Sequence, residues 1–200
     1  MVLVCVDDLI VTGSNEEAIT ILVQEMSTNF AMKDLGQLSY FLGIEIQHTD
    51  ASMVPSQSKY AMELLAKAGM LSCKEVATPS IFKPSTYTDE ELKPFSNPTL
   101  YRSLAGAIQY ITITRLDLQY AINQVCQHMH APLQCHYNAL TMILKYIKGT
   151  HTIALSFTKG PMVLNGYCDS DWASDQVDRR SVAGYCFFLG DDLVSWSSKK

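Results

Sequence analysis

The feature that most constrains this chain is a pair of acidic residues set between two short apolar runs near its start. The run Val2–Val6 is β-branched and apolar, as is typical of a buried strand, and Leu9–Val11 is a second apolar run. Asp7 and Asp8 lie between them. Charged side chains inside a buried hairpin cost free energy unless a cation or hydrogen bonds compensate them. The pair therefore predicts a hairpin whose acids either bind a hard cation such as Mg²⁺ or simply face solvent at a turn.

The composition is that of a folded globular chain. Of the 200 residues 48% are hydrophobic and 18% are charged, with 10 glycines and 7 prolines. A disordered chain has few apolar residues and a high net charge, and collagen-like chains are far richer in glycine and proline. The length corresponds to one ordinary domain or two small ones.

Targeting and membrane signals are not evident in the sequence. The longest apolar stretch, Ser103–Thr114, contains Gln109 and is shorter than the roughly 20 residues that span a bilayer. The start has no basic region, and an acidic pair interrupts its apolar stretch, unlike a signal peptide. The six cysteines are scattered, which predicts free thiols and an intracellular, non-secreted protein. They are Cys5, Cys73, Cys126, Cys135, Cys168 and Cys186.

The net charge of −5 hides a strong asymmetry along the chain. Residues 1–91 carry a net charge of −8, residues 92–168 carry +5, and residues 169–200 carry −2. The whole chain is therefore unlike a non-specific polyanion binder. The basic middle leaves two interpretations open, a solvated surface or a face toward phosphate. Its cations are Lys93, Arg102, Arg115, Lys145, Lys148 and Lys159.

The first 80 residues predict alternating strands and helices. Ser14 or Asn15 can cap a helix from Glu16 to about Thr28, whose apolar residues recur every three to four positions and predict one buried face. A strand is expected over Tyr40–Ile46, with Met53–Gln57 returning as the second arm of a hairpin. A further helix is expected over Ser58–Ala68, ended by Gly69.

After a proline-rich linker at 78–98, the periodicity predicts a helical and basic middle and then a strand-rich end. Pro98 at the first helical position and Asn97 as its cap begin the first helix. Two more helices are expected over Asp117–His130 and from Pro132 to Gly149. Four strands are then expected, over Ile153–Phe157, Val163–Cys168, Gly184–Leu189 and Leu193–Trp196.

Three further groups of residues could carry chemistry. Asp169 and Asp171 share one face if their strand continues, and could hold a metal or simply enter a polar loop. Cys126 and His130 could share a helix face, but their spacing matches none of the usual zinc patterns, so a helix end is the favoured interpretation. Lys145 and Lys148 near a helix C-terminus also favour the helix dipole.

In order along the chain, nine segments resemble a copia-type retrotransposon polyprotein, and together they cover nearly all of it. Each match is short, but nine in the right order are specific. The sequence also resembles short plant copia-derived reading frames known as uncharacterised mitochondrial proteins. The matching segments are Val6–Ile10, Phe30–Gly36, Phe41–Ile44, Ser56–Tyr60, Thr114–Asp117, Leu144–Thr150, Gly166–Ala173, Arg179–Ser181 and Ser195–Lys200.

The resemblance implies an α+β fold in three parts. Residues 1–57 would be the C-terminal part of a polymerase palm, with the metal-binding hairpin at 2–12 and a primer-gripping hairpin at 40–57. Residues 58–150 would be a mostly helical thumb and connection. Residues 151–200 would be an incomplete RNase H-like domain, with its opening strands from about residue 162.

The resemblance also implies the site residues and the cofactor. Asp7, with Asp8 beside it, would be a Mg²⁺ ligand for nucleotidyl transfer, and Asp169 matches the first catalytic acid of RNase H. Both reactions would use two metals about 4 Å apart. Arg115, together with the two lysines of the 144–150 segment, would bind an RNA/DNA template–primer duplex. The implied compartment stays open: nucleus, cytoplasm, or a copy encoded in the mitochondrial genome.

The departures from the family pattern shape the functional expectation. Cys5 replaces the tyrosine before the acidic pair, and Leu116 replaces a proline. The family's fingers and remaining palm acid would precede residue 1, and the later RNase H acids would follow residue 200. Each site then keeps only part of its ligand set, and catalysis needs positioned ligands. We therefore expect a polymerase–RNase H fragment that is inactive alone.

Two alternatives stay open beside the inactive fragment. The chain could be a piece of a longer, active polyprotein. It could instead be a non-catalytic nucleic-acid-binding remnant that uses the basic helical middle, in which case its duplex binding would weaken steeply with salt.

Overall fold

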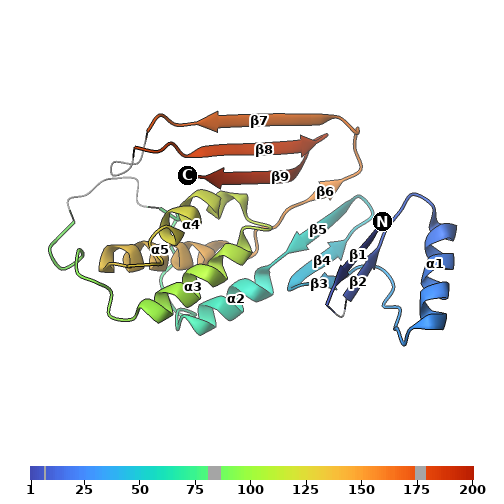
Figure 1. Cartoon of the computed structure of the whole chain (residues 1–200), viewed down its shortest axis with the longest axis horizontal. Coiled ribbons are helices and arrows are strands. Elements are labelled where there is room, and N and C mark those ends of the chain that lie inside the picture. Colours follow the sequence, from blue (N-terminus) through green and yellow to red (C-terminus); the bar gives the residue numbers. More distant parts are fainter. Residues whose placement is uncertain (7, 81–86, 174–178) are drawn as a thin grey trace. The chain divides into compact units, whose positions relative to one another are not determined.

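A computed structural model describes residues 1–6, 8–80, 87–173 and 179–200 (Figure 1). The described residues form a mixed α/β structure with five α-helices and several small antiparallel sheets. The chain divides into two compact units, Met1–Leu42 and Gly43–Lys200. The expected α+β class is confirmed at this level, whereas the palm, thumb and RNase H boundaries stay predictions.

The first unit begins with the predicted hairpin. Strands β1 (Val2–Cys5) and β2 (Asp8–Val11) pair antiparallel, with Cys5 opposite Asp8. Val6 follows β1 with a φ of 50°, the left-handed backbone found in the tightest hairpin turns. The expected hairpin is therefore confirmed.

The expected burial of β1 is wrong. Val4 is 66% exposed and Leu3 47%, and no described residue of the first unit is fully buried. An apolar run is buried only when another layer covers it, and a two-stranded hairpin alone is at best marginally stable. Besides this hairpin, the described part of the first unit contains only one helix and one two-residue strand.

Helix α1 (Glu16–Asn29) has the predicted start. The Asn15 side chain accepts a hydrogen bond from the Ala18 N–H at 3.0 Å, and two glutamates occupy the first turn. These acids favour the positive end of the helix dipole. The predicted apolar face is only half-buried, because the first unit has too few elements to enclose it.

The strand expected over 40–46 is interrupted. Strand β3 (Tyr40–Phe41) ends at Leu42 and Gly43, whose φ angles are 49° and 77°. Glycine adopts such angles at little cost, so the chain turns here rather than continuing extended. Strands β4 (Ile44–His48) and β5 (Ser52–Ser56) then pair antiparallel, which confirms the predicted return arm.

The second unit contains the hydrophobic core, built from four helices: α2 (Ser58–Lys67), α3 (Pro98–Ile111), α4 (Gln119–Cys126) and α5 (Gln134–Thr150). Pro98 begins α3, and Asn97 accepts from the Leu100 N–H at 3.0 Å, both as predicted. The fully buried side chains of the core include Leu65, Tyr101, Leu104, Ile108, Ile122, Leu140, Leu144 and Ile147.

Three predicted element bounds in this region are corrected. The helix expected over 117–130 is instead a 3₁₀ turn, Leu116–Leu118, followed by α4 over Gln119–Cys126. Helix α5 begins at Gln134 rather than Pro132. The strand expected over 153–157 shortens to β6 (Phe157–Thr158), since only this end pairs with β5.

The end of the chain forms a three-stranded antiparallel sheet in the order β7 (Leu164–Ser170), β8 (Ala183–Leu189), β9 (Asp192–Lys199) (Figure 1). This matches three predicted strands. Strands β7 and β8 are slightly longer than expected, whereas β9 extends well beyond the predicted Leu193–Trp196. Strand β9 contacts α4, whereas every residue of the edge strand β7 is exposed. The sheet therefore rests on the helices through β9.

Candidate nucleic-acid and metal-binding residues

The second acid of the pair, Asp8, lies just after the turn between β1 and β2. Asp8 is the first residue of β2, is exposed, and pairs with the half-buried Cys5. Asp7 lies outside the described residues. Carboxylate oxygens suit a hard divalent cation, so the chemistry of Asp8 fits the predicted ligand role. A single exposed carboxylate does not by itself hold such an ion in place.

Asp169 lies in the exposed strand β7, opposite Gly184 of β8. One of its carboxylate oxygens, Oδ1, accepts a hydrogen bond from the Ser170 N–H at 2.8 Å. The strand ends at Ser170, so Asp171 lies beyond it and accepts the Val182 N–H at 2.6 Å. The expected continuous strand face carrying both acids is therefore not formed.

Metal-ligating side chains do not gather elsewhere in the described part of the chain. Within it, no group of three or more His, Cys, Asp or Glu side chains is placed to hold a metal ion. The described residues alone thus do not complete a metal site. The roles of Asp7, Asp8 and Asp169 stay predictions.

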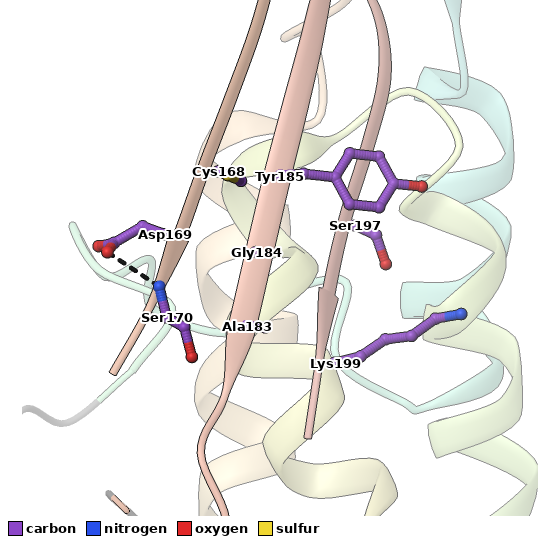
Figure 2. Close-up of a pocket in the computed structure, with 8 residues that line it drawn as sticks. All are labelled: Cys168, Asp169, Ser170, Ala183, Gly184, Tyr185, Ser197 and Lys199. Atoms are coloured by element: carbon purple, nitrogen blue, oxygen red, sulfur yellow. Dashed lines mark hydrogen bonds between the residues drawn. The ribbon is translucent and has the colours of Figure 1, made fainter. Parts of the chain in front are cut away.

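The sheet carries one cavity that the sequence did not indicate. It measures about 560 Å³ and is lined mainly by one face of the strands, including Cys168, Tyr185 and Lys199. In Figure 2 the side chains of Tyr185, Ser197 and Lys199 extend to the right of their strands, and that of Asp169, which also lines the cavity, extends to the left of β7. The only signal in the sequence for this cavity was the strand alternation, which places Cys168, Tyr185 and Lys199 on one face of the sheet.

The two predicted duplex-binding lysines lie in α5. Lys145 and Lys148 are both partly exposed, and Lys148 is in the last turn. Side chains of this kind can keep their ammonium groups in water while their stems cover apolar surface. Their reach toward phosphate therefore stays a prediction.

Arg115, by contrast, is buried, with only 3% of its surface exposed. Its guanidinium donates to both carboxylate oxygens of Asp117, at 2.9 and 2.7 Å, and to the Thr150 carbonyl at 2.7 Å. It also lies 5.8 Å from the centre of the Tyr146 ring. This geometry gives Arg115 a structural role, joining the end of α5 to the turn after α3, and does not favour a phosphate contact.

The Asp117 carboxyl responds to this partner. Burial would raise its pKa, but hydrogen bonds and charge from Arg115 outweigh burial, with Tyr146 also donating, and hold the pKa below its usual range. A buried charge pair is retained only when such bonds satisfy it. The family resemblance pointed to the Thr114–Asp117 segment. Residue type alone did not show whether Arg115 forms buried hydrogen bonds within the protein or contacts phosphate.

The histidines and cysteines at 126–136 lie around the end of α4 and the start of α5. His136 Nδ1 accepts the Leu133 N–H at 3.0 Å, and its ring stacks on His128 with centroids 3.6 Å apart. Burial lowers the pKa of His136 to about 4, with the neighbouring His128 adding to the shift. Burial also raises the pKa of the Cys126 thiol to about 11. Both groups are therefore uncharged near neutral pH, in agreement with the helix-end interpretation.

The other predictions on thiols and membranes can be compared directly. All six cysteines lie in the described part of the chain and all are free, as expected. Among the described helices, none has the length and apolar character needed to cross a bilayer.

Comparison with known proteins adds the family. Residues 1–82 match the family model described as reverse transcriptase (RNA-dependent DNA polymerase). An uncharacterized mitochondrial protein of Arabidopsis thaliana is 42% identical over 199 residues, covering 99% of this chain and 82% of the relative. No solved structure matches the chain.

Two further relatives are much longer. The retrovirus-related Pol polyprotein from transposon RE2 of Arabidopsis thaliana is 40% identical over 99% of this chain. The one from transposon TNT 1-94 of Nicotiana tabacum is 32% identical over 100% of it. The chain spans only 14% and 16% of these two polyproteins.

Proposed function

Because this chain belongs to the copia-type retrotransposon reverse transcriptase family, we propose that it is a segment of an RNA-directed DNA polymerase that contacts a template–primer duplex. The observation that carries this proposal is similarity to Pol polyproteins along essentially the whole chain rather than at one motif. The β1–β2 hairpin, with an acidic residue at its turn, is the feature such a polymerase would need.

The finer assignments form part of the same proposal. The β1–β2 hairpin would carry the polymerase acids Asp7 and Asp8, and the β4–β5 hairpin would lie at the primer end. The helices α2–α5 would form the thumb and connection, and β7–β9 would open an RNase H-like domain with Asp169 as its first acid. Polymerases of this family use a divalent metal, and these acids would supply part of its ligands, with Mg²⁺ as the proposed ion.

Incomplete ligand sets make the 200-residue chain catalytically inactive in this proposal. Nucleotidyl transfer depends on two firmly held metals, and few ligands hold Mg²⁺ weakly. Binding of a duplex needs only positive surface and survives the loss of catalysis. In the alternative, this chain is a piece of a longer, active polyprotein. That longer protein would then extend a primer.

A binding and extension experiment separates these functions. The chain is titrated with a fluorescent RNA–DNA template–primer duplex at several salt concentrations, and Lys145→Glu with Lys148→Glu is compared with Asp8→Asn. We expect affinity to fall with salt and to drop about tenfold in the double lysine variant, because each phosphate contact releases counterions. The Asp8→Asn chain should bind at least as well as the unchanged chain.

Catalysis is tested in the longer polyprotein, with changes at both polymerase acids and with the double lysine variant. There, Asp7→Asn and Asp8→Asn should abolish Mg²⁺-dependent primer extension, while the lysine variant should weaken duplex binding. Equal duplex binding by the lysine variant and the unchanged chain would overturn the binding proposal. Primer extension by the isolated 200-residue chain would overturn its inactivity.

A further inference from the structure

Three segments that are distant in the sequence meet at the C-terminal end of α3. Here we define residues 110–115 as the α3 junction. The last carbonyl groups of a helix have no partner within it, so other segments can bind them. Gln57 Nε2 donates to the Tyr110 carbonyl at 3.1 Å, and Trp196 Nε1 donates to the Thr112 carbonyl at 3.1 Å. One helix end thus receives donors from the β5–α2 connection and from β9.

Gln57 is committed to this junction. It is 3% exposed and sits at the N-cap position of α2, yet its side chain makes no capping bond there. The side-chain amide instead spans to α3, because its oxygen accepts from the Thr114 hydroxyl at 2.9 Å while its nitrogen reaches Tyr110. A buried amide with both ends bonded fixes one arrangement of its neighbours.

Contacts around Gln57 tie the β4–β5 hairpin to the same place. Ser56, the last residue of β5, is buried and pairs with Glu45 of β4. In the first turn of α2, the Tyr60 hydroxyl donates to the Ala107 carbonyl at 3.0 Å, and the Tyr60 ring packs edge-on against Tyr110. The hairpin therefore enters the helical core through a set of directional contacts with α3.

The sheet reaches the junction from its own side. Trp196 lies in β9, the strand of the β7–β9 sheet that contacts the helices (Figure 1). At the start of β9, the Asp192 carboxylate accepts the Thr158 N–H at 2.8 Å and its hydroxyl at 3.2 Å, and β6, which contains Thr158, pairs with β5. The sheet and the hairpin are thus connected both through the α3 junction and through β6.

We propose that the α3 junction couples the β4–β5 hairpin to the β7–β9 sheet, with Gln57 and Trp196 as its positioning residues. A change at one anchor is transmitted through the backbone of the α3 junction to the other. The significance for nucleic acid rests on the proposed function. If the hairpin lies at a primer end and the sheet opens an RNase H-like domain, the junction fixes the spacing between the two sites along a bound duplex.

The test uses the indole signals of the 200-residue chain. The sequence has 2 tryptophans, Trp172 and Trp196, so the ¹⁵N-labelled protein gives two indole N–H resonances to follow by NMR. Gln57→Leu keeps a side chain of similar volume and removes both hydrogen bonds of the Gln57 amide group. We expect it to shift the Trp196 indole resonance and to speed its hydrogen exchange roughly fivefold, while the exposed Trp172 is unchanged.

The reciprocal variant and a matched control complete the test. Trp196→Phe keeps an aromatic ring but removes the donor, and should speed amide exchange in the β4–β5 ladder by a similar factor. Gln134→Leu is the control, because the Gln134 side chain bonds to Asn138 within α5, away from the junction, and it should leave both readouts unchanged.

Failure has a distinct signature. If Gln57→Leu does not fold, Thr114→Val removes one bond to Gln57 at nearly constant shape and gives the same reading with a smaller shift. Unchanged Trp196 exchange in a folded Gln57 or Thr114 variant would overturn the coupling. Because the measurement uses no nucleic acid, its failure is separate from a failure of duplex binding.

Discussion

The two compact units of this chain differ in how far they bury their apolar segments. Strand β1 is made of Val, Leu, Val and Cys, yet three of these side chains are exposed. Helix α3 carries Leu104, Ile108 and Ile111 at helical spacing, and all three are buried against other helices. An apolar pattern thus indicates which side chains can be buried, while the number of neighbouring elements decides whether they are.

The largest effect should come from the same truncation made in both units. Leu104→Ala should cost about 3 kcal/mol of the free energy of unfolding, because it leaves a cavity among buried helices. Leu3→Ala in β1 should cost less than about 1 kcal/mol, since Leu3 is 47% exposed. Urea unfolding of each variant, followed by circular dichroism, measures the difference. Equal losses would contradict the contrast between the units.

The second effect is pH dependence, which should belong to the second unit because residues 1–42 contain no histidine. The pKa of His136 falls from 6.5 to about 4 on folding, so the unfolded chain binds its proton first. Its contribution to stability is complete above pH 6.5 and is lost as the pH falls toward 4. After allowance for solvent screening we expect a loss of about 1 kcal/mol.

Comparison with a variant isolates this histidine from the carboxylates that titrate at lower pH. His136→Gln should have a shallower fall in stability between pH 6.5 and 4 than the unchanged chain, measured by urea unfolding at each pH. The exposed His130 provides the matched control, as His130→Gln should keep the original slope. Identical slopes for all three proteins would show that His136 titrates normally.

The third comparison is between the two asparagine caps, whose effect is local to one helix each. Asn97 caps α3 and Asn15 caps α1, each with a 3.0 Å side-chain bond. Either change to alanine should cost about 1 kcal/mol locally. Asn97→Ala should lower the urea midpoint of the helical core, whereas Asn15→Ala should only speed amide exchange in α1, followed by mass spectrometry. An unchanged midpoint in the first variant, or unchanged α1 exchange in the second, would contradict the role of that cap.

Local signals in the sequence predicted the elements well. The Asn97–Pro98 start of α3, the Asn15 cap and the hairpin around the acidic pair all follow from chemistry within about four residues. The interruption at Leu42–Gly43 was missed because a lone glycine inside an apolar run is also compatible with a strand. The division of the predicted 117–130 helix into a 3₁₀ turn and the shorter α4 was also missed.

For the candidate site, too, the sequence predicted some features and left others to the tertiary structure. The order of short motifs identified the family without any coordinates. It did not separate Arg115, whose guanidinium is bound to Asp117 and Thr150, from the partly exposed Lys145 and Lys148. All three are basic residues near α5, and only burial and hydrogen-bond partners give them different roles.

The sequence by itself determined the family, the mixed α/β class and the starts of α1, α2 and α3, because these depend on residue type, order and short-range periodicity. Tertiary structure alone decided that the core lies in the second unit and that Arg115 is buried, with hydrogen bonds to Asp117 and Thr150. It alone also brought Gln57 and Trp196 to one helix end. These outcomes depend on which groups meet across long stretches of chain, and the free energy of a buried polar group is set by its partners rather than by its own identity.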